Sequence, residues 1–447
     1  MILSRRGDRG SGSKGKRFAA CAALASMAAC AAVSASAQEN VYFQIGAKAK
    51  GPAKIALGLP FFVAKKAGRK EDSLAAHDLW DVVRSDLLLS RYFDLPQGGP
   101  AYDGKNMRAI EGPWAKAGAS YLLAGSAYED AAGVALEALL VATANGDRIL
   151  GKTIHGPKTS LRQIAHRLSD EVVLALTGKP GIAQSRVAFS NDSTGHREIY
   201  IADYDGAGLT RLTHDRSLDL LPRFSPDGRF LVYTSYKNKN PDLYRMDLRT
   251  GRVSLLSGLQ GLNVAGGFSP HGSRLLMTVS SGSTPGIWLL SLKSGKIERL
   301  THPEGADSSP TFSPDGSQAA FVSDRAGNPE IYLLDLLTRR STKLTSLNWC
   351  DSPSWAPTGE WIAFAGREAS EDPIDIFLTD ITGRQLSRIT RGEGSNEDPR
   401  WSADGRFIVF SGNRSGRYEI YVMDGDGSAP HRLVSLPGSS ITPDWSR

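Results

Sequence analysis

The chain has 447 residues, of which 40% are hydrophobic and 22% charged, so it is long enough to bury more than one hydrophobic core. Its formal net charge of +6 at first suggests a nucleic-acid partner. Residues 1–37, however, hold six basic residues and one acidic residue, so most of the excess charge belongs to that segment. The rest of the chain is nearly neutral, so its net charge gives no support for a surface that binds polyanions.

Residues 1–37 have the organisation of a cleaved export signal. A basic stretch is followed by an alanine-rich apolar run from Phe18, and Ala35 and Ala37 form a small-residue cleavage site before Gln38. The alternative is a retained membrane helix, because residues 18–37 are just long enough to span a bilayer. We predict export to the periplasm, with the membrane reached only indirectly, through partners.

Cysteine usage adds one constraint on the mature chain. Cys21 and Cys30 lie in the predicted leader, so only Cys350 remains and no intramolecular disulfide can form. A nucleophilic role for Cys350 would need a positioned base. We expect it instead to be a half-buried loop residue.

Residues 38–53 read as an extended amino-terminal tail. In the middle of this tail, the residues alternate in character as they do in an extended strand. They are Val41, Tyr42, Phe43, Gln44 and Ile45. A short strand near a chain terminus is free to pair with the edge of another sheet. This segment is therefore a candidate binding element.

Residues 54–180 alternate between strand and helix patterns and predict a small α/β domain. Strands are expected at residues 55–59, 121–126 and 134–143, and helices at residues 78–89 and 161–176. The second helix should end at Gly178 and Pro180. Residues 177–185 read as the linker to the rest of the chain.

Residues 181–447 repeat one five-residue corner, first seen as Phe224-Ser225-Pro226-Asp227-Gly228. Its leading aromatic recurs every 43 to 46 residues, as Phe224, Phe268, Phe312, Trp355, Trp401 and Trp445. This period is typical of four-stranded β-propeller blades. Proline presets the turn and glycine supplies its left-handed position, while the aromatic is large enough to fill the gap between blades.

Counting the repeats predicts how the ring closes. Residues 186–190 look like the strand that follows a corner, yet no corner precedes them, and residues 442–445 lead into a corner with no strand after it. Each is half of one blade, and joining them leaves no exposed edge. The predicted fold is an α/β domain followed by an all-β, six-bladed propeller.

A search for catalytic chemistry yields no site. The sequence has no Gly-x-Ser-x-Gly elbow and no His-Glu-x-x-His motif, so we predict no catalytic residue and no cofactor. Residues 203–206 and 424–427 resemble calcium loops but lack the glutamate at position twelve, and we interpret them as hairpin turns. A hydrolase or lactonase with a channel metal, and a generic scaffold, remain alternatives.

One constellation of polar residues lies four or five positions before the corner aromatics. It consists of Asp219, Asn263, Asp307, Asp351, and Glu397 with Asp398. Equivalent positions in a ring converge on one mouth of its channel, where an acidic collar would accept hydrogen bonds from a partner or hold a weakly bound cation. The other interpretation is that each residue caps its own loop, and both stay open.

With these parts assembled, the chain resembles the TolB family of the Tol–Pal system of Gram-negative bacteria. The resemblance covers the export signal, the α/β domain and the six blades. Its specific motifs are Pro60-Phe61, Ser169-Asp170-Glu171-Val172, Leu176-Thr177-Gly178 and Tyr204-Asp205-Gly206.

The resemblance implies a non-enzymatic, monomeric protein that supports outer-membrane integrity and cell division. It implies that the propeller mouth binds the lipoprotein Pal through the collar together with Ala265, Ser308 and Ser309. It also implies that residues 41–45 bind the carboxyl-terminal domain of TolA. Leu262 stands where some family members have histidine, which is a departure from the pattern.

Overall fold

The computed structural model describes residues 54–60, 63–64, 73–103, 105–130, 133–281, 284–302 and 304–447. The predicted export signal, the tail at residues 38–53 with its strand Val41–Ile45, and Phe61 lie outside these residues. Within the described ranges, no helix is both long enough and apolar enough to cross a bilayer. The predicted domain boundaries stay predictions.

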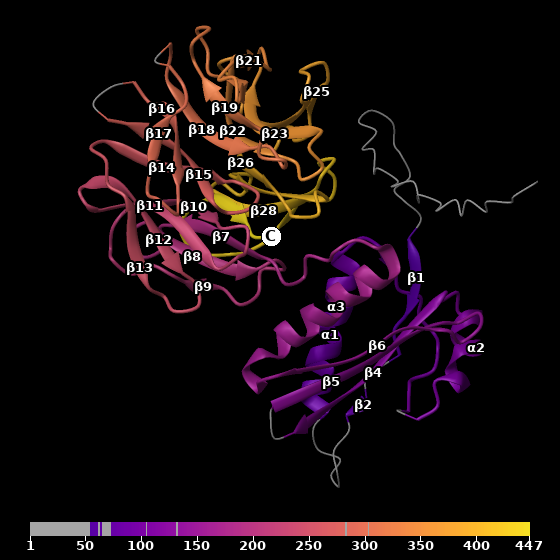
Figure 1. Cartoon of the computed structure of the whole chain (residues 1–447). Coiled ribbons are helices and arrows are strands. Elements are labelled where there is room, and N and C mark those ends of the chain that lie inside the picture. Colours follow the sequence, from indigo (N-terminus) through magenta and orange to yellow (C-terminus); the bar gives the residue numbers. More distant parts are fainter. Residues whose placement is uncertain are drawn as a thin grey trace, which may run out of the picture. The chain divides into compact units, whose positions relative to one another are not determined.

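The amino-terminal region is an α/β sheet with three α-helices (Figure 1). Its strands are β1 (Ile55–Gly58), β2 (Val63–Ala64), β3 (Phe93–Asp94), β4 (Tyr121–Asp130), β5 (Gly133–Ala142) and β6 (Arg148–Gly156). Its helices are α1 (Ser73–Leu89), α2 (Arg108–Lys116), the 3-10 turn η1 (Lys158–Ser160) and α3 (Leu161–Thr177). The sheet order is β3-β1-β4-β5-β6, with β2 beside β4.

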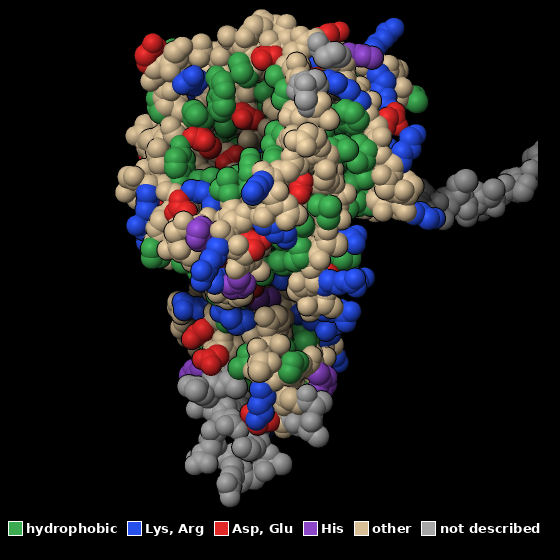
Figure 2. Space-filling model, turned by 90° about the vertical axis from the view of Figure 1, so that its left-hand side faces the viewer, with side chains coloured by type: hydrophobic (Ala, Val, Ile, Leu, Met, Phe, Trp, Pro, Cys, Tyr) green, Lys and Arg blue, Asp and Glu red, His purple; other side chains and the backbone are tan. Residues whose placement is uncertain are grey.

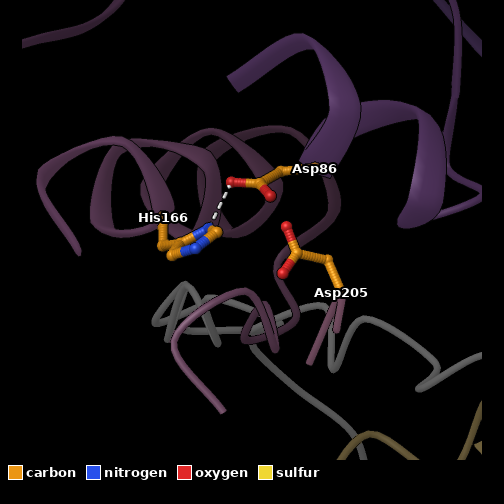
Figure 3. Close-up of side chains that lie close together, drawn as sticks. All are labelled: Asp86, His166 and Asp205. Atoms are coloured by element: carbon orange, nitrogen blue, oxygen red, sulfur yellow. Dashed lines mark hydrogen bonds and ion pairs between the residues drawn. The ribbon is translucent and has the colours of Figure 1, made fainter. Parts of the chain in front are cut away.

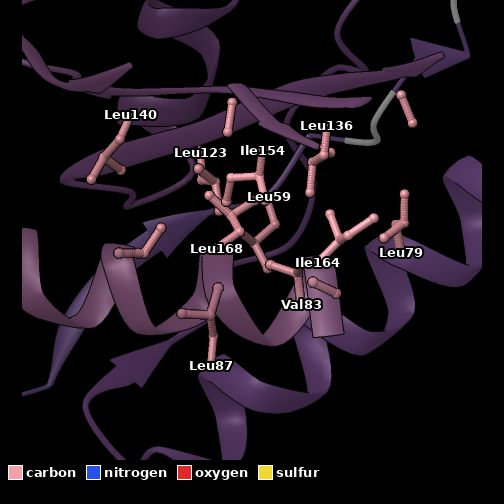
Figure 4. Packing of buried hydrophobic residues seen from close by; sticks show 14 of the residues in the cluster. Leu59, Leu79, Val83, Leu87, Leu123, Leu136, Leu140, Ile154, Ile164 and Leu168 are labelled. Carbon is pink, nitrogen blue, oxygen red and sulfur yellow. The ribbon is translucent and has the colours of Figure 1, made fainter. Parts of the chain in front are cut away.

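Alternation along β4 gives the sheet two packed faces. Leu123 belongs to the cluster that α1 and α3 cover (Figure 4), whereas Leu122 packs with Trp114 of α2. The helix α3 ends at Gly178, which adopts φ +71° and donates its N–H to the carbonyl of Leu174. This is the predicted stop, because glycine takes the left-handed position without strain.

Five elements of this region were not predicted from the sequence: β2, β3, β6, η1 and α2. The helix α2 carries Pro113 in its interior, a residue that normally argues against a helix. The strand β3 has two residues, Phe93 and Asp94, and is too short for a visible alternation. The predicted helices at residues 78–89 and 161–176 are confirmed, although α1 begins five residues earlier.

Six four-stranded sheets follow and form the blades. The inner strands are β10 (Asp219–Phe224), β14 (Leu262–Phe268), β18 (Asp307–Phe312), β22 (Trp349–Trp355), β26 (Asn396–Trp401) and β30 (Ser440–Trp445). The second strands are β7 (Arg186–Asn191), β11 (Phe230–Asn238), β15 (Arg274–Ser280), β19 (Gln318–Ser323), β23 (Trp361–Arg367) and β27 (Phe407–Gly412). The third strands are β8 (Glu198–Asp203), β12 (Asn240–Asp247), β16 (Gly286–Ser291), β20 (Glu330–Asp335), β24 (Asp375–Asp380) and β28 (Glu419–Asp424). The outer strands are β9 (Thr210–Arg211), β13 (Val253–Ser257), β17 (Ile297–Arg299), β21 (Ser341–Lys343), β25 (Leu386–Arg388) and β29 (His431–Arg432).

The predicted closure is confirmed. The last strand, β30, pairs antiparallel with β7, the first propeller strand, and places Trp445 opposite Val187. Trp445 lies in a buried cluster that also contains Phe189 and Phe407, from two neighbouring blades. The corner aromatic therefore fills the space between blades, as its size predicts.

The corner is held by its serine as well as by proline and glycine. In the first copy, Ser225 Oγ accepts a hydrogen bond from the N–H of Phe230 at 2.9 Å and donates one to Asp227 Oδ1 at 2.5 Å. Gly228 has φ +65° and donates to the carbonyl of Ser225. The hydroxyl thus satisfies the backbone N–H of Phe230 and holds the side chain of Asp227 at the turn.

Candidate partner-binding site at the propeller mouth

Each inner strand carries a β-bulge near the end of the propeller where that strand begins, here called the mouth. The register of the inner strand against its neighbour shifts in all six blades, for example between Leu220 and Arg223 in β10. In five blades the bulged residue has a positive φ of 52–56° and is followed by proline: Leu221, Ser309, Ser352, Asp398 and Thr442. Bulges of this kind redirect side chains and occur next to functional sites.

The strand register separates the predicted collar into two groups. Asp219, Asn263 and Asp307 occupy one equivalent position and are fully buried. The same position in the other blades holds Cys350, Asn396 and Ser440. Asp351 and Glu397 stand one residue further along their strands, and Asp398 is a bulge residue. The collar is therefore not one ring of equivalent side chains.

Two of the buried residues, Asn263 and Asp307, are held by hydrogen bonds, and Asn263 also accepts one from Ser257 Oγ of the preceding blade at 2.8 Å. Asn263 donates to the carbonyls of Leu259 and Gly261, at 2.6 and 2.9 Å, so it caps its own loop. Asp307 accepts both of its hydrogen bonds from the guanidinium of Arg325, at 2.9 and 3.0 Å.

Asp219 has no such counter-charge within the described residues. Burial raises the pKa of Asp219 to about 6, and the hydroxyls of Ser235 and Thr213 oppose this shift. Neither hydroxyl makes a well-aligned hydrogen bond to the carboxylate.

The second group forms a linked series across blades at the mouth. Ser309 Oγ donates to Asp351 Oδ1 at 2.8 Å, and Ser352 Oγ donates to Asp398 Oδ1 at 2.9 Å. Each bulge hydroxyl therefore reaches a carboxylate of the following inner strand. Burial raises the pKa of Asp351, against the hydrogen bond from Ser309. The structure thus brings Ser309, Asp351 and Asp398 together.

The remaining predicted residues differ in exposure. Glu397 is half-buried and accepts a hydrogen bond from the hydroxyl of Tyr418, and burial raises the pKa of its carboxyl. Ser308 is half-buried in β18, whereas Ala265 is buried in β14. In Figure 2, acidic side chains are set back in a hollow of the propeller, among hydrophobic ones. Such a surface presents hydrogen-bond acceptors to a partner's N–H groups.

Three charged residues on the inner strands were missed by the sequence reading; Arg223 and Asp444 are buried and Arg400 is half-buried. Arg223, Arg400 and Asp444 occupy equivalent positions two residues beyond the bulge. Arg400 Nε lies 3.8 Å from Asp444 Oδ1, and Asp444 Oδ2 accepts the N–H of Phe224 at 2.8 Å. Burial lowers the pKa of Arg223 to about 10, helped by the charge of Arg400. The available sequence signal was a charged residue just before three of the six corner aromatics.

The expectation for Cys350 was wrong in its location. Cys350 lies in the strand β22 and is fully buried, because it takes the same inward position as Asp219 and Asn263. Its thiol lies 3.4 Å from Thr345 Oγ1 and 3.5 Å from Glu330 Oε2. Burial raises the pKa of Cys350 to about 12, so the thiol stays protonated and is a poor nucleophile at neutral pH.

A second cluster of polar side chains joins the α/β region to the propeller, and we call it the junction (Figure 3). Asp86 of α1 accepts hydrogen bonds from His166 Nδ1 of α3 and from the hydroxyl of Tyr204, both at 2.9 Å. Tyr204 belongs to the turn at residues 203–206, which joins β8 to β9 and is a hairpin turn as predicted. Arg162 of α3 pairs with Asp205 of the same turn.

The junction is also the closest approach to a metal site within the described residues. Asp86, His166 and Asp205 each bring one ligand atom within 4.8 Å of the others. The carboxylates are already engaged, since Asp86 binds His166 and Tyr204 while Asp205 pairs with the guanidinium of Arg162. A cation beside that guanidinium would be repelled, so we interpret the cluster as an ion-pair network.

Comparison with known proteins identifies the family. A family model described as the TolB beta propeller domain matches residues 173–371 and 328–447. The chain belongs to the TolB β-propeller family. The crystal structure of TolB from Acinetobacter baumannii aligns with a TM-score of 0.74 and 26% identity, over 88% of this chain and 97% of that one.

Curated relatives agree over shorter segments. The Tol-Pal system protein TolB of Desulfosudis oleivorans is 35% identical over 210 residues, 46% of this chain and 48% of the relative. The protein TolB homolog of Chlorobium luteolum is 33% identical over 226 residues, 50% of this chain and 51% of the relative. The matched segments thus span about half the length of these TolB relatives.

Two of the TolB-like motifs meet at the junction. Asp170, from Ser169-Asp170-Glu171-Val172, accepts the N–H of Ala183 at 2.8 Å and so fixes the chain that enters the propeller. Tyr204 and Asp205, from Tyr204-Asp205-Gly206, contact α1 and α3. These two motifs therefore serve the connection between the α/β region and the propeller.

Proposed function

We propose that this chain is the TolB component of a Tol–Pal system, a periplasmic protein without enzymatic activity. The observation that carries the proposal is the alignment with the Acinetobacter baumannii TolB structure over 88% of this chain. That extent includes the amino-terminal region as well as the propeller, and it is supported by the names of the curated relatives. In this role the chain acts by binding other proteins, requires no cofactor, and supports the outer membrane during division.

The proposed Pal surface is the mouth. It consists of Asp219, Asn263, Ala265, Asp307, Ser308, Ser309, Asp351, Glu397 and Asp398. Within this set, Asp351, Glu397 and Asp398 are the half-buried acids, so they are the members that a partner can reach most directly. The fully buried Asp219, Asn263 and Asp307 would act by shaping the loops around them. The proposed TolA surface is Val41–Ile45.

Titration calorimetry with the soluble domain of Pal tests the proposal. The double variant Glu397→Gln and Asp398→Asn removes two acceptors while keeping side-chain shape, and we expect affinity to fall roughly 10- to 100-fold, since a hydrogen bond to a charged group contributes about 1.5–3 kcal/mol. Glu360→Gln is the matched control, because the exposed Glu360 lies at the opposite end of its blade.

Two results would contradict the proposal. Absence of Pal binding by the unaltered chain would remove the Tol–Pal assignment itself. Equal affinities of the double variant and the control would remove the mouth as the Pal surface. Deleting residues 39–45 addresses the TolA surface separately, and it should abolish binding to the carboxyl-terminal domain of TolA.

A further inference from the structure

The junction holds more acidic than basic charge in a buried place. Asp86 on α1 and Asp203 and Asp205 on the β8–β9 turn supply three carboxylates. The charged groups facing them are Arg162, whose Nε lies 3.7 Å from Asp203 Oδ2, and Arg186 of β7, whose charge acts on Asp203. The remaining titratable groups here are His166, Tyr204 and Asp170, which accepts the N–H of Ala183. Tyr204 stays neutral because burial raises its pKa.

His166 lies between the two parts of the chain. It is 2% exposed, and its Nδ1 faces Asp86 Oδ2 at 2.9 Å. An ionised carboxylate only accepts, so Nδ1 carries the proton of this bond. The other ring nitrogen, Nε2, is buried and has no hydrogen-bond partner in the described part of the chain.

The position of Nε2 indicates what would satisfy it. Nε2 lies 3.9 Å from Asp203 Oδ2, too far for a hydrogen bond in the neutral ring but within ion-pair range once Nε2 is protonated. Asp203 belongs to the propeller, whereas His166 and Asp86 belong to the α/β region. A second proton on this ring would therefore create an attraction across the junction.

We propose that His166 is a proton-controlled lock between the α/β region and the propeller. In the imidazolium form it binds Asp86 through Nδ1–H and attracts Asp203 through Nε2–H, which fastens the β8–β9 turn to α1 and α3. In the neutral form the contact with Asp203 is lost, while the hydrogen bond to Asp86 remains. The proposal does not rest on the Tol–Pal assignment.

The electrostatic surroundings favour the charged form. Burial and the charge of Arg162 lower the pKa of His166. The hydrogen bond from His166 to Asp86 and the charges of Asp86 and Asp205 outweigh them, so the pKa is raised. A basic group whose pKa is raised on folding stabilises the fold fully below the ordinary pKa of about 6.5. That contribution is lost as the pH rises through the higher pKa of the folded state.

Amide hydrogen exchange of the full chain between pH 5.5 and 8.5, corrected for intrinsic rates, tests the lock. We expect peptides covering residues 203–207 to exchange faster as the pH rises. The protection factor should fall by at most about tenfold for each unit by which the pKa of His166 in the folded state exceeds the ordinary value of about 6.5. In His166→Gln this dependence should vanish. His196→Gln, at an exposed position, should keep it.

A second variant separates the lock from general destabilisation. Asp203→Asn retains His166 but removes the anion opposite Nε2. In histidine-labelled protein, the ring resonance of His166 should still titrate, with a lower midpoint, while the turn no longer changes protection with pH. A turn that is equally protected at all pH values in the unaltered chain would overturn the proposal. So would a pH dependence that persists in His166→Gln or Asp203→Asn.

Discussion

Asp219 shows how one position serves different chemistry in different blades. Its equivalents are Asn263, Asp307, Cys350, Asn396 and Ser440, all buried at the start of an inner strand. Asp307 has Arg325 as a bidentate partner, whereas Asp219 has none within the described residues and a pKa raised to about 6. The same carboxylate is therefore compensated in one blade and uncompensated in another.

This difference predicts opposite effects of one substitution. An acid whose folded pKa is raised favours the folded state when protonated, so Asp219 destabilises the fold increasingly as the pH rises from about 4 through 6. We expect Asp219→Asn to raise the free energy of unfolding by about 1–3 kcal/mol at pH 8 and by much less at pH 4.5. The estimate uses about 1.4 kcal/mol for each unit by which folding raises the pKa.

Asp307→Asn should do the reverse. It removes the buried carboxylate that faces Arg325 and leaves only the exposed Glu304 as an ion-pair partner, which costs about 1–3 kcal/mol. Denaturant unfolding at pH 4.5 and 8 measures both variants. Equal and destabilising effects of the two substitutions at pH 8 would show that Asp219 is compensated after all.

Sequence reading located the mouth but not the roles of its residues. The collar residues were selected because they are acidic or polar and lie close before a corner aromatic. A shift of one residue along a strand, however, turns a side chain to the opposite face. Asp219 and Asp351 therefore looked equivalent although one is interior and the other half-buried. The charged Arg223 and Asp444 were missed because their burial depends on the neighbouring blades.

At the scale of the element, the bulge of β14 is the exception among the inner strands. Gly266 stands where the other five blades have proline, and a Cβ on Gly266 would lie 2.1 Å from the carbonyl oxygen of Pro310. A Cβ on the adjacent Gly267 would meet nothing closer than 3.6 Å. The glycine therefore permits a close approach of two neighbouring inner strands.

Two neighbouring substitutions test this packing. Gly266→Ala should destabilise the propeller by about 1–3 kcal/mol, the usual cost of forcing extra atoms into a packed interior. Gly267→Ala should be close to neutral, because its new methyl group has ordinary contacts. Thermal unfolding of the two variants side by side decides the matter. A neutral Gly266→Ala would mean that β14 and β18 can move apart freely.

The elements that could be predicted are those with strong local signals. The strand expected at residues 134–143 corresponds to β5 (Gly133–Ala142), because its hydrophobic pattern ends at an Asn145-Gly146 turn. The helix α2 was missed, since Pro113 contradicts helix propensity and packing of Trp114 against the sheet prevails. The bulges were missed too, although the proline two residues before five of the corner aromatics marks them.

At the scale of the whole molecule, the ring depends on its last strand. β30 supplies the inner strand of a blade whose other strands are β7, β8 and β9. It also brings Trp445, whose indole N–H donates to Ser185 Oγ at 2.8 Å. Losing this strand exposes the inner edge of β7 and empties the space that the indole fills.

Removing residues 442–447 should therefore lower the melting temperature by roughly 10 °C, given about 3–5 kcal/mol for a buried tryptophan and about 2–4 °C per kcal/mol in a chain of this size. Removing Arg447 alone should change it little, because that side chain is exposed. Calorimetric scans of the two truncated chains provide the comparison. An unchanged melting temperature after the longer deletion would contradict closure by β30.

The pairing of β30 with β7 also imposes an order of events on folding. The N–H of Arg186 and Ser446 Oγ are 2.8 Å apart in space and 260 residues apart along the chain. Contacts between such distant residues form slowly, because a long loop must close before they gain anything. A chain that emerges from its amino end therefore remains an open arc until its final strand is released. Completion of the ring is then a late, single step, during which the unpaired β7 edge is the segment most exposed to misassembly.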